Sequence, residues 1–249
     1  MIDIQAVLLD IEGTTTPIDY VFGVLFPYFL NHLADFLDQH GQDPEVKLDL
    51  DLLRQEYLAD LESRAQAHPQ SNPLPPWQDL PVEYINFLVQ SDRKSSGLKS
   101  LQGKIWQQGY QKRELCSQIF ADLPDFFRVW QTKGKRAYIY SSGSVIAQKL
   151  LFEFSEFGDL TNYISGYFDT AIGSKKEANS YTKIAAQIGL LPPQILFISD
   201  LVAELEAAQI AGLATLFSSR PGNRSHNPQG FGTVSDFNQI PNLIRQISD

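Results

Sequence analysis

Residues Ala6-Val7-Leu8-Leu9-Asp10-Ile11-Glu12-Gly13-Thr14-Thr15-Thr16 join a short apolar run to two carboxylates and a polar turn. The run has the length of a β-strand, and alternation along a strand places the side chains of Asp10 and Glu12 on the same side. Two like charges side by side are unfavourable unless a cation or a reacting group uses them. Taken alone, the segment fits either an ordinary strand and turn or the start of a catalytic site.

Further apolar runs rich in β-forming residues follow later in the chain, over residues 137–140, 195–198 and 213–217. Near-continuous apolar character is typical of strands buried on both faces of a parallel sheet. Helical spacing separates the later runs, over residues 146–154, 184–189 and 204–211. Gly212 stands at the C-terminal end of the last of these helices. With a final strand over 231–234 and a closing helix over 238–247, the alternation predicts a doubly wound α/β fold with a mainly parallel sheet.

The long interval after the first strand has a different pattern, because it predicts helices and no strand. An apolar stripe runs over 21–37, where Pro27 should kink or break the helix. Further helices are predicted over 48–61, 82–89 and 98–110, and a loop with five prolines over 68–81. An insertion of about 100 residues is too long for a crossover, so we expect a helical cap domain over residues 18–119, at the C-terminal edge of the sheet. Residues 1–17 and 120–249 would form the α/β core.

The composition argues against several classes of protein. The net charge is −9 and no basic run occurs, which argues against a nucleic-acid partner. Cys116 is the only cysteine, and the four histidines are scattered, so neither a disulfide framework nor a cysteine-based zinc site is expected. The sequence shows no basic leader and no apolar run of about 20 residues. We therefore expect a cytoplasmic protein with no membrane partner.

Polar side chains follow three of the predicted strands. Asp10 and Glu12 follow the first, Ser141 the second and Asp200 the run over 195–198, and Lys175 lies in an intervening loop. Because parallel strands end at one edge of a sheet, we expect these side chains to converge there. Carboxylates, a hydroxyl and an ammonium are the groups that phosphoryl transfer through a covalent aspartyl phosphate requires.

The requirements of phosphoryl transfer suggest a role for each of these groups. Asp10 is the expected nucleophile, and a divalent cation must offset its repulsion from a phosphate dianion. Mg²⁺ suits such an oxygen-only site, with Asp200, Asp10 and a group of Glu12, side chain or backbone carbonyl, as ligands. Lys175 supplies a fixed positive charge to the phosphoryl oxygens.

Ser141 is expected to hydrogen-bond the transferring phosphoryl oxygens, together with Ser142 and the amides of the following helix N-terminus. Other roles stay open: Ser141 or Asp200 could simply cap a helix, and Lys175 could be a solvated loop lysine. Glu204, one turn beyond Asp200, could order the loop or reach the metal through water.

Glu12 is a candidate acid that protonates the leaving oxygen and then activates water. An ordinary glutamate pKa of about 4.3 leaves only a small protonated fraction near neutrality, and a nearby Mg²⁺ and lysine lower that fraction further. The negative charge of the substrate must therefore help Glu12 to hold a proton.

The constellation resembles the haloacid-dehalogenase superfamily through Asp10-x-Glu12-Gly13-Thr14, the strand-terminal Ser141, Lys175 before a helix, and Asp200 ahead of Glu204. The superfamily motif usually has aspartate where this chain has Glu12. With that glutamate, Asp-Ile-Glu-Gly-Thr-Thr-Thr-Pro resembles the acireductone synthase (enolase-phosphatase) family of methionine salvage. The similarity covers nearly the whole chain and includes the segments Leu25-Phe26-Pro27-Tyr28, Asp92-Arg93-Lys94, Leu101-Gln102-Gly103-Lys104-Ile105-Trp106, Tyr138 to Val145, Phe168-Asp169-Thr170, Ile172-Gly173 and Arg220-Pro221-Gly222-Asn223.

The resemblance implies a substrate and a two-step reaction. The substrate would be 5-(methylthio)-2,3-dioxopentyl 1-phosphate, a small phosphorylated diketone, which the enzyme enolises and then dephosphorylates to the acireductone. It further implies a monomer with Mg²⁺ as cofactor. The family's roles carry over to the metal ligands Asp10, Glu12 and Asp200 and to the substrate-binding residues Ser141, Ser142 and Lys175.

Three other interpretations remain open at this stage: a phosphatase of the same superfamily without an enolase step, a dehalogenase, and a non-catalytic binding module with the superfamily fold. The dehalogenase is disfavoured because its reaction has no leaving alkoxide to protonate. In the cap, Arg93 and Lys94 could meet the substrate or form a solvated basic turn.

Overall fold

The computed structural model describes residues 3–66, 74–77, 81–91, 93, 95–223, 227–241 and 243. The chain divides into two compact units. Unit 1 holds the described residues up to Val24 and from Leu115 onward, and unit 2 holds Leu25–Glu114. The chain therefore changes unit after Val24 and after Glu114, whereas the sequence suggested residues 17 and 119.

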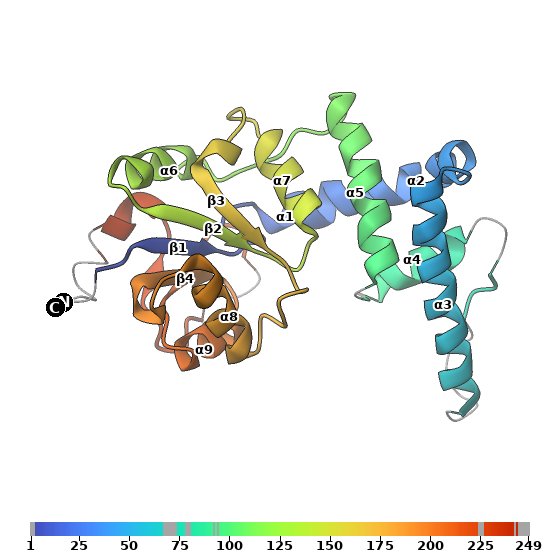
Figure 1. Cartoon of the computed structure of the whole chain (residues 1–249). Helices are drawn as coiled ribbons and strands as arrows, with labels where there is room; N and C mark the ends of the chain where they lie inside the picture. Colours follow the sequence, from blue (N-terminus) through green and yellow to red (C-terminus); the bar gives the residue numbers. More distant parts are fainter. Residues whose placement is uncertain are drawn as a thin grey trace. The chain divides into compact units, whose positions relative to one another are not determined.

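A parallel sheet forms the centre of unit 1 (Figure 1). Its six described strands are β1 (Ala6–Leu9), β2 (Arg136–Tyr140), β3 (Ile164–Phe168), β4 (Ile195–Ser199), β5 (Ala214–Ser218) and β6 (Thr233–Val234), in the order β3-β2-β1-β4-β5-β6. Every neighbouring pair is parallel. With helices on both faces, this sheet confirms the predicted doubly wound α/β fold.

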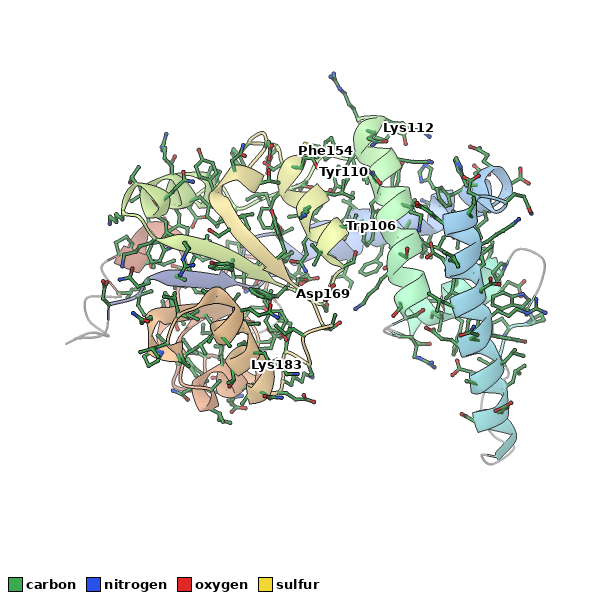
Figure 2. All side chains as sticks on the ribbon, in the orientation of Figure 1. Trp106, Tyr110, Lys112, Phe154, Asp169 and Lys183 are labelled. Atoms are coloured by element: carbon green, nitrogen blue, oxygen red, sulfur yellow. The ribbon has the colours of Figure 1, made fainter. Side chains whose placement is uncertain are left out.

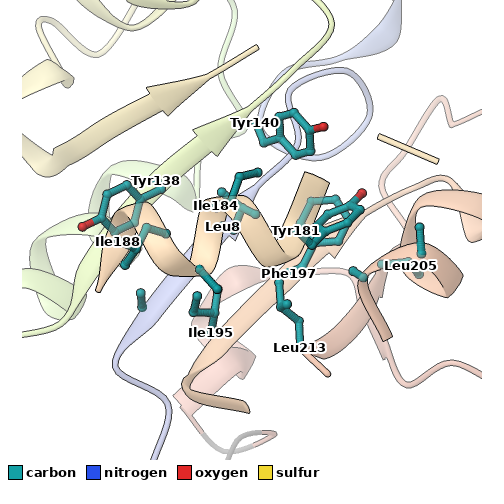
Figure 3. Close-up of a cluster of buried hydrophobic side chains, with 14 of the residues drawn as sticks. Leu8, Tyr138, Tyr140, Tyr181, Ile184, Ile188, Ile195, Phe197, Leu205 and Leu213 are labelled. Carbon is teal, nitrogen blue, oxygen red and sulfur yellow. The ribbon is translucent and has the colours of Figure 1, made fainter. Parts of the chain in front are cut away.

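The helices of unit 1 lie in two layers (Figure 1). Helices α6 (Leu123–Thr132) and α7 (Val145–Glu153) cover one face of the sheet, and α8 (Ala178–Ile188) and α9 (Val202–Ile210) cover the other. On the second face, alternate residues of the strands, such as Leu8, Tyr138 and Phe197, pack against Ile184 and Ile188 of α8 (Figure 3). Burial on both faces explains why the central strands are apolar along their whole length.

Strand β3 and helix α6 were not predicted from the sequence. β3 is an edge strand whose sequence Ile-Ser-Gly-Tyr-Phe is only partly buried, so it lacks a continuous apolar run. Helix α6 does carry a helical signal, because Leu123, Phe126, Phe127 and Trp130 follow helical spacing and are all buried. Part of the predicted closing helix, over 238–247, lies outside the described residues.

Unit 2 consists of helices in its described part. They are α2 (Phe26–His40), α3 (Pro44–Gln66), α4 (Val82–Gln90) and α5 (Ser96–Gln111). The predicted helices over 48–61, 82–89 and 98–110 coincide with α3, α4 and α5. Ser95 begins α5 by accepting a hydrogen bond from Leu98 N at 3.2 Å. Trp106 on the buried side of α5 (Figure 2) donates its indole N–H to the carbonyl of Leu25 at 2.8 Å.

Pro27 does not break the predicted apolar stripe but falls in the first turn of α2. Before it run a short helix α1 (Ile18–Tyr20) and a π-helical turn (Val21–Leu25). The three elements follow one another without a break, so Pro27 lies inside a continuous helix from Ile18 to His40. A proline inside a helix removes one backbone hydrogen bond, and the change to a π-helical turn directly before Pro27 is an irregularity of the kind that accompanies such a loss. Most of the predicted proline-rich loop, over 68–81, lies outside the described residues.

One described segment, Ile18–His40, passes a length-and-composition test for a membrane-spanning helix, with a mean hydropathy of 1.2 in its most apolar window. This is weak evidence for a membrane span, because the core helix of a water-soluble protein passes the same test. Within the segment, Phe29, Leu33 and Leu37 are buried in the protein.

Candidate active site

Asp10 follows β1 at the C-terminal edge of the sheet. Its amide donates to the carbonyl of Ile198 on β4 at 3.0 Å, and the residue is only 2% exposed. The next residues form a tight turn, in which the amides of Thr14, Thr15 and Thr16 approach the carbonyl of Ile11 at 3.0–3.1 Å. The turn fixes the backbone on both sides of Asp10 and Glu12.

Lys175 connects two carboxylates in this site. Its ammonium forms ion pairs with Asp10 and, at 2.7 Å, with Glu204 of α9. The hydroxyl of Ser199 donates to Glu204 at 2.9 Å and lies 3.4 Å from Asp10 Oδ2. Tyr181 of α8 donates to the Lys175 carbonyl at 2.7 Å, which holds the backbone of the lysine. Lys175 is only 7% exposed, so it is not a solvated loop lysine.

The site contains more carboxylates than cations among the described residues, and its electrostatics reflect this. Burial and the charges of Asp10 and Glu204 raise the pKa of Asp200 to about 8. Burial raises the pKa of Glu204 to about 7, although Lys175 opposes the shift. For Lys175, burial alone would lower the pKa, but the charges of Asp10 and Glu204 raise it above its ordinary value. A bound divalent cation would offset this excess of negative charge.

Asp200 and Asn223 border a small space beside Gly13, which we call the cradle, and their chemistry shows whether such a cation fits there. A Cβ at Gly13 would lie 2.5 Å from Asp200 Oδ2 and 2.8 Å from Asn223 Oδ1, so both oxygens face the space beside this glycine. The positive φ of 73° at Gly13 brings its backbone close to them. Carboxylate and amide oxygens are donors that suit Mg²⁺. Within the described residues, however, no group of three or more His, Cys, Asp or Glu side chains forms a ready metal site.

The second strand end brings serines to the same edge of the sheet. Ser141 is buried, its amide donates to the carbonyl of Phe168 at 3.2 Å, and its hydroxyl accepts a hydrogen bond from Gly143 N at 3.2 Å. Ser144, not Ser141, caps α7 by accepting a hydrogen bond from Ala147 N. Ser142 is half-buried in the same turn.

The turn after β2 is braced from α7. Gln148 is buried and donates its amide to the carbonyls of Gly143 and Phe168, both at 2.9 Å. Asp169, which follows β3 (Figure 2), accepts a hydrogen bond from Ala171 N at 2.9 Å. The strand ends after β2 and β3 are thus tied to each other.

The structure excludes one of the two roles considered for Asp200, that of a helix cap. Helix α9 has Leu201 at its N-cap without a side-chain cap, so Asp200 does not cap the helix. The Leu201 amide instead donates to the hydroxyl of Ser199 at 3.1 Å. The carboxylate of Asp200 is left facing the cradle beside Gly13.

Glu12 is half-buried, and its isolated β-bridge with Thr16 closes the turn. Its charge contributes to raising the pKa of both Lys175 and Asp200, which places it in the same electrostatic cluster. The structure thus brings Asp10, Glu12, Lys175 and Asp200 to one edge of the sheet, as the sequence predicted for these positions.

The end of β5 and the loop after it contribute residues for which the sequence predicts no role. Ser218 Oγ and Asn223 Nδ2 both donate to the carbonyl of Gly13, at 2.9 and 3.0 Å. Arg220 donates to the carbonyl of Thr14 at 3.3 Å and pairs with Asp122 at 2.8 Å. From the sequence, the segment Arg220-Pro221-Gly222-Asn223 is only a family-like motif, since nothing local shows that it contacts a turn more than 200 residues earlier.

In unit 2, Arg93 has a partner within the same unit. Its guanidinium makes two hydrogen bonds to the carboxylate of Asp60, at 3.0 and 3.2 Å, and the hydroxyl of Tyr84 donates to the same carboxylate at 3.1 Å. Arg93 therefore ties α3 to the segment after α4. Lys94 lies outside the described residues.

No protein-family model matches the chain. Among curated proteins, "Enolase-phosphatase E1" from Synechococcus elongatus is 53% identical over 243 residues, which cover 96% of this chain and 98% of that protein. The protein of the same name from Pseudomonas fluorescens is 43% identical over 95% of this chain and 97% of its own length. The "Probable bifunctional methylthioribulose-1-phosphate dehydratase/enolase-phosphatase E1 1" of Vitis vinifera is 41% identical over 95% of this chain, which matches 47% of that longer protein.

Two solved structures extend the comparison. The crystal structure of the UTR4 protein from Saccharomyces cerevisiae superposes with a TM-score of 0.73 at 35% identity, covering 94% of this chain and 98% of that one. A HAD phosphatase from Thermococcus onnurineus gives a TM-score of 0.58 at 16% identity, covering 97% and 98% of the two chains. At such low identity, the second likeness shows the fold alone.

Proposed function

This chain belongs to the enolase-phosphatase E1 family, and from this premise we propose the reaction that it catalyses and how its own residues carry out the phosphoryl transfer. The protein is an enolase-phosphatase of methionine salvage and acts on a small phosphorylated substrate. That substrate is 5-(methylthio)-2,3-dioxopentyl 1-phosphate, and the products are the acireductone 1,2-dihydroxy-5-(methylthio)pent-1-en-3-one and phosphate.

The bridge that Lys175 forms between Asp10 and Glu204 is the observation that carries the proposed mechanism. A buried ammonium paired with Asp10 fixes the direction of this carboxylate, as a nucleophile requires. The anchor on Glu204 holds the lysine at the sheet edge, where its charge also stabilises phosphoryl oxygens in the transition state.

Mg²⁺ is the proposed cofactor, held by Asp10, Asp200 and a group of Glu12. When bound, it offsets the repulsion between carboxylate and phosphate and stabilises negative charge on enolate and phosphoryl oxygens in turn. The oxygen-only donor set and the raised pKa of Asp200 support this assignment.

Residues of the protein bind the phosphate, attack phosphorus and transfer the proton. Ser141, Ser142 and the amides at the start of α7 bind the phosphate of the substrate. Asp10 attacks phosphorus, so that an aspartyl–phosphate bond forms while the bond to the substrate oxygen breaks. Glu12 gives its proton to that leaving oxygen and then takes a proton from the water that hydrolyses the aspartyl phosphate.

We also retain the proposal that the helical insertion, residues 18–119, is a cap domain that gates access to the site. The connections support it, because Leu25–Glu114 form a separate compact unit and both chain crossings lead into the core close to the site, where the amide of Phe120 donates to the carbonyl of Thr15 at 3.0 Å. A monomeric, cytoplasmic enzyme completes the proposal, in keeping with the small-molecule metabolism named for the relatives.

The decisive test follows the diketone phosphate by absorbance of the enediol product and by phosphate release in the same sample. We expect both signals with Mg²⁺ and neither after chelation with EDTA. An ordinary phosphate ester without the diketone serves as the control, because it can report only the phosphatase step.

Two outcomes would contradict the proposal. Phosphate release without enediol absorbance would leave a phosphatase with no enolase step. If no phosphate ester were hydrolysed in the presence of Mg²⁺, the chain would be a binding module that has kept the fold.

A further inference from the structure

The loop after β5 holds a buried side chain that touches the nucleophile turn and faces Asp200. We propose that Asn223 is a positioning residue for the divalent cation: its Nδ2 fixes the carbonyl of Gly13, and its Oδ1 accepts a hydrogen bond from the hydration shell of the cation beside Asp200. This inference rests on the proposed Mg²⁺ dependence.

The structure shows Asn223 acting as a donor through its side-chain nitrogen, Nδ2. Asn223 Nδ2 donates to the carbonyl of Gly13 and to the carbonyl of Ser218, each at 3.0 Å. Ser218 Oγ donates to the same Gly13 carbonyl at 2.9 Å. Two donors thereby hold the Gly13 carbonyl, one from the last residue of β5 and one from the loop after it, and the conformation of the turn that follows Asp10 depends on both.

The proposed role of Asn223 as an acceptor is based on its side-chain oxygen, Oδ1. Asn223 is 7% exposed, and among the described residues its Oδ1 receives no hydrogen bond. A buried polar atom left unsatisfied costs about 1–3 kcal/mol, so such an atom is normally explained by a water, an ion or a ligand. This oxygen and Asp200 Oδ2 lie 2.8 and 2.5 Å from one point, the position of a Cβ on Gly13.

Once a cation holds Asp200 in its ionised form, both oxygens that face this space are acceptors and need a donor between them. Mg²⁺ usually keeps several of its waters when a protein binds it, and those waters are strong donors. A cation held by Asp200 would therefore present a water proton toward Asn223. Residues that hydrogen-bond to the shell around a metal commonly change its affinity about 10- to 100-fold when they are mutated.

The experiment titrates Mg²⁺ into the substrate-free full-length protein by calorimetry. Asn223→Ala removes donor and acceptor, Asn223→Asp keeps an acceptor oxygen and loses the donor, and Ser218→Ala removes only the other clamp on Gly13. We expect Asn223→Ala to weaken Mg²⁺ binding about 10-fold or more and Ser218→Ala to stay within about threefold of the wild type. Asn223→Asp should bind Mg²⁺ at least as tightly as the wild type, because it keeps the acceptor and adds a negative charge. Thermal unfolding in EDTA reports the loss of the clamps separately.

Each alternative result is decisive. If Asn223→Ala binds Mg²⁺ like the wild type, or if Ser218→Ala weakens binding equally, Asn223 is a clamp only and the inference is overturned. The same holds if Asn223→Asp fails to restore binding while it folds normally. If the wild type itself binds no Mg²⁺, the proposed metal dependence falls together with this inference.

Discussion

Lys175 Nζ lies 2.7 Å from Glu204 Oε2, and both side chains are buried. Because the same ammonium pairs with Asp10, one lysine from the loop before α8 links the nucleophile to a carboxylate on α9. The charge of Lys175 is thus held at a fixed place before substrate arrives, which is the condition for electrostatic stabilisation of a transition state.

The first prediction concerns this lysine. Lys175→Met should lower kcat/KM by about 10²- to 10³-fold, because the phosphoryl oxygens lose a preorganised positive charge. Lys176→Met is the matched control, since Lys176 is exposed in the same loop. Steady-state phosphate release from the diketone phosphate measures both variants. Equal activity of Lys175→Met and the control would remove Lys175 from the mechanism.

Asp10→Asn should lower turnover by more than about 10³-fold while the fold stays intact, because the amide cannot act as the nucleophile. Phosphate release measures the loss, and circular dichroism verifies the fold. Asp19→Asn changes an exposed aspartate in the same N-terminal segment and should keep full activity. Activity of Asp10→Asn near that of the wild type would exclude an aspartyl phosphate at this residue.

Gly13→Ala tests the cradle. It should destabilise the fold by about 1–2 kcal/mol through its positive φ, and it should also weaken Mg²⁺ binding because the new Cβ meets Asp200 and Asn223. Gly134→Ala isolates the first effect, since Gly134 has a φ of 70° and nothing within 4 Å of its added Cβ. Urea unfolding in EDTA and calorimetric Mg²⁺ titration separate the two effects. Unchanged Mg²⁺ affinity in Gly13→Ala would argue against a cation at this place.

The metal-free protein should become less stable as the pH rises. The folded protein holds a proton on Asp200 up to a pKa of about 8, whereas the ordinary value is 3.8. Between these values the folded state binds more protons than the unfolded state, so the free energy of unfolding falls with increasing pH. We expect a loss of about 2 kcal/mol between about pH 6 and pH 8.

Asp200→Asn should reduce this pH dependence, because its side chain does not ionise, whereas Glu204, whose pKa is raised to about 7, still contributes at the lower end of the range. Glu206→Gln is the control, since it neutralises an exposed carboxylate on α9 and should leave the slope unchanged. Urea unfolding in EDTA at several pH values provides the measurement. A slope in Asp200→Asn equal to that of the wild type would show that another group governs the pH dependence.

The central strands could be predicted because burial on both faces leaves a continuous apolar run in the sequence. β3 could not, since an edge strand is only partly buried and its Ser165 and Gly166 interrupt the run. In α6 the sequence does carry a signal, because Phe126, Phe127 and Trp130 follow helical spacing and are buried. Helix capping also needed the structure, because Ser141 and Ser144 are equally good caps by composition.

By itself, the sequence determined the α/β class, the helical insertion and the positions of Asp10, Glu12, Ser141 and Asp200 at strand ends, because these follow from local periodicity. Only the tertiary structure decided how Lys175 meets Asp10 across 165 residues and how Asn223 meets Gly13 across 210 residues. Such contacts depend on how distant strands pair in the sheet, and no local pattern encodes the distance between them.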